Sequence, residues 1–182
     1  NGISCLAENM PGSGAYRPGD VFKTYSGKTV EVFSTDAEGR NVLSDGLWKA
    51  GEFDPEYIVD LATLTGAVIV ALGNQISGMW SNDDNVASRL KNAAERSGEE
   101  VWRMPLNDQF RKYMTDSAFA DIRNGSIGGR AGSSNTAAAF LEFFVPNRGF
   151  EKDGEKIPWV HLDIAGSAWG PGSVSYTHLR AH

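Results

Sequence analysis

Two acidic side chains stand one residue apart, just before an arginine, in the segment STDAEGR at residues 34–40. In an extended segment, residues i and i+2 project to the same side, so Asp36 and Glu38 can direct both carboxylates at one point. Two carboxylates held that close repel each other, and a bound divalent cation reverses the repulsion. One explanation of the spacing is therefore part of a cation site, with Arg40 as a counter-charge.

A solvated acidic turn is the alternative explanation of this pair. Short motifs recur by chance, so from spacing alone the turn is the more frequent of the two explanations. Arg40 supplies a counter-charge in both cases. Other motifs in the chain are therefore needed to choose between a cation site and an acidic turn.

The elements that would position the pair can be predicted from the hydrophobic pattern. Residues 21–34 alternate around a Ser26-Gly27 turn, which predicts a hairpin of two short strands ending just before the pair. Apolar residues at helical spacings predict a helix from about Arg40 to Phe53. The acidic pair is thus expected at a strand-to-helix junction, a common place for a site in α/β proteins.

The rest of the chain alternates between strand-like and helix-like segments. Buried strands are expected at 57–64, 76–81 and 159–166, a short buried helix at 65–74, an amphipathic helix at 84–101 and a core helix at 135–145. This order predicts an α/β fold, a three-layer sandwich with a mixed, largely parallel sheet flanked by helices.

Three other features suggest chemistry, and each has a simpler explanation. The segment SGKT at 26–29 resembles the end of a phosphate-binding loop, but Phe22 stands where that motif needs glycine. The glycine-rich segment 124–134 could bind an anion, although a surface loop is the more frequent use of such glycines. His161 lies in an apolar strand and is expected as a hydrogen-bonded core histidine rather than a metal ligand.

The composition narrows the class of protein. With 182 residues, of which 41% are hydrophobic, the chain can bury a core of its own, and one compact domain is expected. A net charge of -6 argues against nucleic acid as a main partner. Cys5 is the only cysteine, which excludes an internal disulfide and fits a reducing, cytoplasmic setting. No apolar stretch is long enough to cross a bilayer, so no membrane partner is expected.

Seven segments together resemble one family, the leucyl aminopeptidases, also called cytosol aminopeptidases. In order they are ENMPGSGAYRPGD (8–20), SGKTVEV (26–32), STDAEGR (34–40), DLATLTGA (60–67), ALG (71–73), FADIRN (119–124) and WVHLDIAGSAW (159–169). They follow the family's order along almost the whole chain, which makes chance agreement very improbable. The resemblance favours the cation site over the acidic turn.

The resemblance implies a metal-dependent aminopeptidase that releases N-terminal amino acids, with a leucine-like preference, from peptides. Asp36 and Glu38 match metal ligands, the glutamate bridging two divalent ions, for which Zn, Mn, Mg or Co would be reasonable. The two ions would polarise the carbonyl and activate a water. Arg40 matches a catalytic residue, which would hold a bicarbonate ion acting as base or stabilise the charge on the tetrahedral intermediate.

The same resemblance implies a substrate site and an assembly. Thr63, Leu64 and Gly66 would line the substrate site through backbone groups and the wall of the side-chain pocket. Ala165 would add to that wall, and small residues there leave room for a leucine-sized side chain. The resemblance also implies a homohexamer in the full-length protein.

The chain also departs from the family pattern. Ser34 stands where the family has asparagine, and Asn41 where it usually has leucine or isoleucine. A ligand segment with two lysines and two aspartates is expected before residue 1. Asp36 and Glu38 alone cannot fill two coordination spheres of four or more ligands each, so the chain is expected to be inactive alone.

We therefore expect residues 1–172 to be part of the family's catalytic domain, truncated at both ends, and residues 173–182 to be a foreign or read-through tail. One rival hypothesis is a non-catalytic binding module or DNA-architectural relative of the same fold. The intact Asp36, Glu38 and Arg40 favour the enzyme. A third hypothesis, another two-metal hydrolase, is disfavoured by the TLTG and DIAG segments, which appear in order beside STDAEGR.

Overall fold

The hairpin expected before the acidic pair is present in the computed structural model, which describes residues 1–126 and 128–168. Strand β1 (Val21–Lys23) pairs antiparallel with β2 (Thr29–Glu31), and Gly27 takes a φ of 86° in the turn between them. Positive φ is a conformation that glycine adopts without steric cost. Strand β2 also pairs, in parallel, with β6 (Ile122–Arg123) to complete a small three-stranded sheet.

A second, four-stranded sheet forms the centre of the molecule, with the strand order β3-β7-β4-β5. Its strands are β3 (Ile58–Ala62), β4 (Ile76–Ser81), β5 (Glu100–Arg103) and β7 (Trp159–Asp163). The pairs β3 with β7 and β4 with β5 are parallel, whereas β4 and β7 are antiparallel. The sheet is therefore mixed and largely parallel, as the sequence predicts, although the hairpin belongs to a separate sheet.

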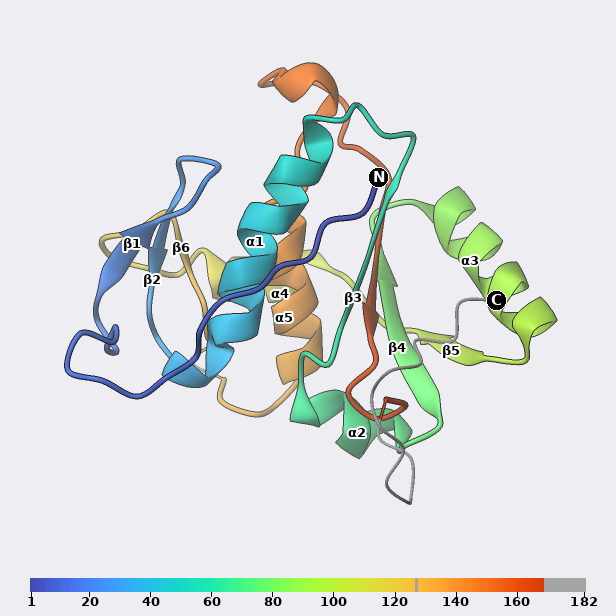
Figure 1. Ribbon diagram of the computed structural model, residues 1–182, viewed down its shortest axis with the longest axis horizontal. Coiled ribbons are helices and arrows are strands. Elements are labelled where there is room, and N and C mark those ends of the chain that lie inside the picture. Colours follow the sequence, from blue (N-terminus) through green and yellow to red (C-terminus); the bar gives the residue numbers. More distant parts are fainter. Residues whose placement is uncertain (127, 169–182) are drawn as a thin grey trace.

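Helices cover both faces of the four-stranded sheet. Helices α1 (Glu38–Gly51) and α5 (Ser133–Glu142) lie on one side and α3 (Asp84–Ser97) on the other, while α2 (Gly66–Leu72) sits at one end (Figure 1). The side chains of strand β7 point alternately toward the two helical layers, one on each face of the sheet. Trp159 belongs to the larger core cluster with α5, whereas Val160 and Leu162 pack with residues of α3.

The predicted end of the amphipathic helix is wrong. The sequence predicts a helix over 84–101, but α3 ends at Ser97, and Gly98 closes it in the left-handed conformation (φ 75°) with its N–H bonded to Ala94 O. A C-terminal glycine of this kind is a common helix stop. The residues beyond it form β5, whose Glu100 pairs with Ile76 of β4.

Other boundaries differ from the sequence-based expectation by a few residues. Helix α1 begins at Glu38 rather than near Arg40, and the core helix α5 begins at Ser133 and ends at Glu142. Helix α4 (Asp108–Met114) was not predicted. The predicted tail at 173–182 lies outside the described residues. In the described part of the chain, no helix combines the length and the apolar character needed to cross a membrane.

His161 is a core histidine, as predicted. Its side chain is 1% exposed, and its Nδ1 lies 2.6 Å from Oδ1 of Asp60 on the neighbouring strand. The imidazole also lies beside the rings of Trp80 and Trp159, with centroid distances of 5.6 and 6.2 Å. The carboxylate partner and the aromatic neighbours account for this buried polar group without a bound metal.

Candidate active site

The acidic pair lies on a helical turn rather than on an extended segment. Ser34 is extended (φ -135°, ψ 129°), but the 3-10 helix η1 (Thr35–Ala37) follows it directly and runs into α1. The prediction that Asp36 and Glu38 lie on an extended segment, which would point both side chains to the same side, is therefore wrong, because a 3-10 turn leads into the helix instead. Glu38, in the first turn of α1, lies where the helix dipole favours negative charge.

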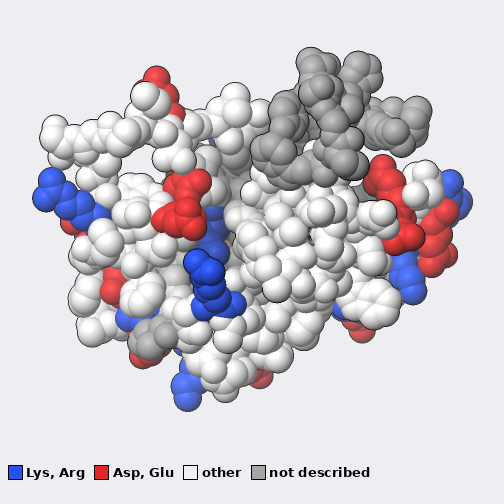
Figure 2. All heavy atoms as spheres, turned by 90° about the horizontal axis from the view of Figure 1, so that it is seen from below, with Lys and Arg blue, Asp and Glu red and all other residues white. Residues whose placement is uncertain are grey.

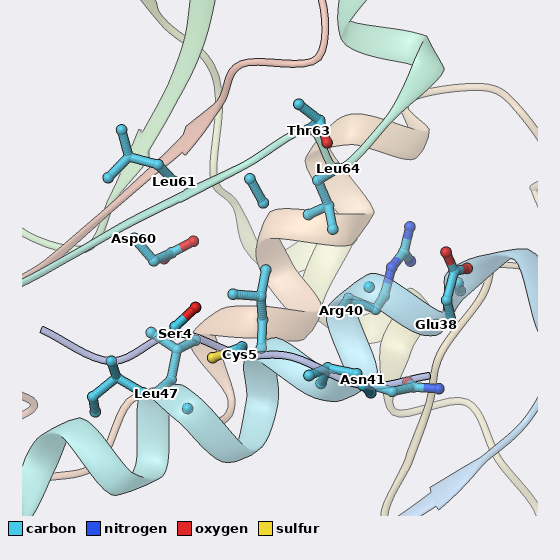
Figure 3. Close-up of a pocket in the computed structure, with 18 of the residues that line it drawn as sticks. Ser4, Cys5, Glu38, Arg40, Asn41, Leu47, Asp60, Leu61, Thr63 and Leu64 are labelled. Atoms are coloured by element: carbon cyan, nitrogen blue, oxygen red, sulfur yellow. The ribbon is translucent and has the colours of Figure 1, made fainter. Parts of the chain in front are cut away.

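Asp36 and Glu38 nevertheless face the same hollow of the molecule. This hollow has a volume of about 2150 Å³ and is lined by most of the first 17 residues, by one side of α1, and by strand β3 with the residues just before and after it. Asp36 is exposed and Glu38 half-buried. In Figure 3 the Glu38 carboxylate and the Arg40 guanidinium rise from the start of α1 toward the same side, below Leu64.

The structure brings most of the predicted site residues together. Asp36, Glu38, Arg40, Thr63 and Leu64 all line the hollow. The first turn of α1 packs close to the TLTG segment, since a Cβ on Gly39 would lie 3.4 Å from Leu64 Cδ1.

The other two predicted residues lie apart from the hollow. Gly66 begins α2, and Ala165, which is 5% exposed, lies two residues beyond the end of β7. Neither lines the hollow. Their predicted contact with substrate therefore remains a prediction.

Arg40 is half-buried with a fully buried Nε, and another of its nitrogens is fixed by a backbone carbonyl. Its Nη1 donates a hydrogen bond of 2.8 Å to Asn124 O, and among the described residues its Nε has no partner. Burial lowers the pKa of Arg40 to about 10, while the carboxylates of Asp163, Asp36 and Glu38 act in the opposite direction. The guanidinium therefore stays charged at neutral pH and retains an unused donor.

Asn124, the last residue of the FADIRN segment, is a residue for which the sequence predicted no role. Its fully buried side chain accepts hydrogen bonds from the N–H groups of Phe33 (2.8 Å) and Ser34 (3.0 Å) and donates one to Ser34 O (2.9 Å). The same residue binds Arg40 through its carbonyl. Asn124 thus holds the chain on both sides of the acidic pair. About ninety positions separate it from its partners, too far for local spacing to reveal the contact.

Asp163, the last residue of β7, is a second residue without a predicted role. Its carboxylate is 1% exposed and accepts three hydrogen bonds. Oδ1 accepts from the N–H groups of Leu64 (3.0 Å) and Ala165 (3.2 Å), and Oδ2 accepts from the hydroxyl of Thr65 (2.6 Å). The TLTG and DIAG segments, which are far apart in sequence, therefore meet at this one side chain.

The acidic pair fits part of a divalent-cation site. Carboxylate oxygens are the ligands that hard divalent ions prefer, and both side chains face open space in the hollow. Glu38 Oε1 accepts one hydrogen bond of 3.3 Å, from Asn9 Nδ2. The described residues contain no group of three or more histidine, cysteine, aspartate or glutamate side chains that could hold a metal ion. Asp36 and Glu38 can thus supply some ligands of a metal site and not a complete set.

These features define a class of protein: an α/β domain with an acidic pair and a half-buried arginine beside the carboxyl ends of parallel strands. Residues 1–181 match the family described as the cytosol aminopeptidase family, catalytic domain. The chain belongs to the cytosol aminopeptidase family. The resemblance that the sequence motifs indicate is therefore confirmed.

Individual relatives agree with this assignment. The chain is 52% identical over 169 residues to a probable cytosol aminopeptidase of Cenarchaeum symbiosum (strain A), covering 92% of this chain and 32% of that protein. A probable cytosol aminopeptidase of Photorhabdus laumondii is 51% identical over 173 residues, covering 95% and 32%. The solved structure of a mutant tomato leucine aminopeptidase superimposes with a TM-score of 0.81 at 43% identity, covering 90% of this chain and 30% of that one. The chain thus spans about a third of the length of these relatives.

Proposed function

We propose that this chain carries part of the active site of a metal-dependent aminopeptidase, which releases N-terminal residues, preferably leucine-like ones, from peptides. The observation that carries the proposal is that Asp36, Glu38 and Arg40 face the same hollow as Thr63 and Leu64. An acidic pair, a guanidinium and an apolar wall at one place are the groups needed to activate a water, stabilise an oxyanion and bind a side chain.

Asp36 and Glu38 would supply some of the carboxylate ligands of two divalent ions. When bound, the ions would polarise the peptide carbonyl and lower the pKa of the attacking water. Zinc, manganese, magnesium and cobalt all suit such a site. Because the chain covers about a third of the relatives' length, we propose that the remaining ligands come from residues outside it and that the chain is inactive alone.

Arg40 would stabilise the negative charge that develops as the peptide carbonyl becomes tetrahedral, or would hold a bicarbonate ion that accepts a proton from the water. Its Nη1 is committed to Asn124 O and its Nε is buried, which leaves Nη2 to face a ligand. Burial strengthens an electrostatic interaction because the surrounding dielectric is low. The guanidinium is fixed in advance, so little reorganisation is needed during the reaction.

Leu64 and Thr63 would form one side of the substrate pocket, with Gly66 and Ala165 adding small residues nearby. The Leu64 side chain is half-buried and lies above Arg40 in Figure 3. An apolar wall at this place favours an aliphatic side chain on the substrate. Backbone groups of the TLTG segment would orient the peptide.

The family resemblance also carries the proposals of a homohexamer and of a cytoplasmic location. The relatives' names describe cytosolic enzymes, which supports the location. The non-catalytic, DNA-architectural alternative has no specific observation in its favour among the described residues. On the face shown in Figure 2, acidic and basic side chains are interspersed and form no continuous basic patch in the part that is described.

The function can be tested with the protein expressed from the complete reading frame that encodes this chain. We expect hydrolysis of leucine nitroanilide but not of N-acetyl-leucine nitroanilide, because an aminopeptidase requires a free α-amine. Chelation should abolish the activity, and added Mn²⁺ or Zn²⁺ should restore it. Equal cleavage of the two anilides, or no hydrolysis with either metal present, would contradict the proposal.

A further prediction concerns Asn124. Replacing Asn124 by alanine removes three hydrogen bonds that hold Phe33 and Ser34 next to the acidic pair. We expect kcat/KM for leucine nitroanilide to fall about 10- to 100-fold, the usual effect of losing a partner that orients metal ligands. Steady-state kinetics and calorimetric titration with Mn²⁺ measure the effect.

The exposed Asn85 on α3 provides the control, since its replacement by alanine should change neither quantity. The positioning role would be wrong if Asn124→Ala lowered the melting temperature but left the Mn²⁺ affinity and kcat/KM of the folded protein unchanged.

A further inference from the structure

The sheet brings two turns of the candidate site to one place. Strands β3 and β7 are parallel, with Ala62 opposite Asp163, so their carboxyl ends lie at the same edge. The ladder continues one step beyond the strands, since Ile164 N donates to Ala62 O at 2.9 Å. The TLTG and DIAG segments therefore leave the sheet side by side.

A single carboxylate joins these two turns. Asp163 binds Leu64 N on one side, Ala165 N on the other and the Thr65 hydroxyl with its second oxygen. A buried charge is unfavourable unless hydrogen bonds compensate it, and charge-assisted bonds of this kind are short and strong. The arrangement fixes the distance between the backbones of Leu64 and Ala165 more firmly than neutral hydrogen bonds would.

The same carboxylate orients the start of α2. The Thr65 hydroxyl donates to Asp163 and accepts from Val68 N at 3.2 Å, which caps the helix. Gly66, the first residue of α2, is therefore positioned through the same network. The three proposed wall residues Leu64, Gly66 and Ala165 all depend on Asp163.

We propose that Asp163 is a positioning residue that sets substrate side-chain selectivity by holding the Leu64 and Ala165 walls at a fixed separation. This inference rests on the proposed aminopeptidase function. Asp163 does not line the hollow, so it acts through Leu64, Thr65 and Ala165 rather than by touching substrate. If the hydrogen bonds of Asp163 are lost, Leu64 can shift. A substrate with a large N-terminal side chain then loses contacts with Leu64, whereas a substrate with a small side chain does not make those contacts in either case.

The effect should therefore differ between substrates. A hydrophobic pocket distinguishes side chains by about 10- to 200-fold per methylene, so loosening one wall should lower the ratio of kcat/KM for leucine nitroanilide over alanine nitroanilide by about 10-fold. A variant that only reduced the fraction of folded protein would lower the measured kcat/KM for both substrates by the same factor.

Asp163→Asn, Thr65→Val and Thr65→Ser, made in the protein expressed from the complete reading frame, test the inference. Valine matches the shape of threonine without its hydroxyl, whereas serine retains the hydroxyl. We expect Asp163→Asn and Thr65→Val to lower the leucine-to-alanine ratio about 10-fold, and Thr65→Ser to keep it near that of the wild type. Hydrogen exchange at Leu64 should become faster in the first two variants only.

An unchanged ratio in active, folded Thr65→Val protein would overturn the inference and leave the aminopeptidase function standing. The comparison of Thr65→Val with Thr65→Ser tests the positioning role even if Asp163→Asn does not fold. Wild-type protein that hydrolysed neither anilide with metal present would overturn the proposed function, and the selectivity role with it.

Discussion

Glu38→Gln is expected to lower kcat for leucine nitroanilide by about 1000-fold, the equivalent of about 4 kcal/mol of transition-state stabilisation supplied by metal ions. Glutamine is close in shape but neutral, so it is a much weaker ligand for a divalent cation than the carboxylate. The fold should be retained, since among the described residues the Glu38 carboxylate accepts only a long bond, from Asn9. Kinetics with the protein from the complete reading frame and calorimetric titration with Mn²⁺ measure the loss.

Glu95→Gln is the matched control, because Glu95 is exposed on α3, on the other side of the central sheet. It removes the same charge without touching the hollow and should leave kcat unchanged. In metal-free protein, Glu38→Gln should not lower the melting temperature, since it relieves repulsion with Asp36. A Glu38→Gln variant with wild-type Mn²⁺ affinity and kcat would show that the acidic pair is only a solvated turn.

Replacement of Arg40 by methionine is expected to lower kcat about 100- to 1000-fold, the cost of losing one donor to a developing oxyanion. Methionine preserves much of the volume and is compatible with burial. Arg40→Lys should recover only part of the rate, because an ammonium cannot hold Asn124 O and reach a ligand in the same way as the planar guanidinium.

The two proposed roles of Arg40 predict different responses to bicarbonate. If Arg40 holds the ion, added bicarbonate should raise the rate of depleted wild-type protein but not that of Arg40→Met. If Arg40 stabilises the oxyanion directly, bicarbonate should have no effect on either. Arg89→Met, which removes an exposed arginine from α3, is the control and should behave like the wild type in both media. Full activity in Arg40→Met would exclude both roles.

The sequence predicted the fold well where the pattern is long and local. The hairpin, the strands β3, β4 and β7 and the helix after the acidic pair follow from alternation and helical spacing, and the structure contains all of them. The predicted burial of β3 is wrong, because β3 is an edge strand in which only Ile58 is buried and Leu61 is 54% exposed. The local pattern did not predict elements that depend on partners far away in the sequence. Strand β6 has two residues and exists because β2 pairs with it, and β5 follows a helix whose apolar pattern runs on past Gly98.

The sequence by itself determined which chemical groups this protein has: the acidic pair, the arginine after it, and the TLTG and DIAG segments whose order indicates the family. Only the tertiary structure decided how they are held. It replaced the extended acidic segment with a 3-10 turn and revealed Asn124 and Asp163 as the buried partners of Arg40 and Leu64. The physical reason is that hydrogen bonds between residues about ninety positions apart depend on sheet register and burial, which local spacing does not encode.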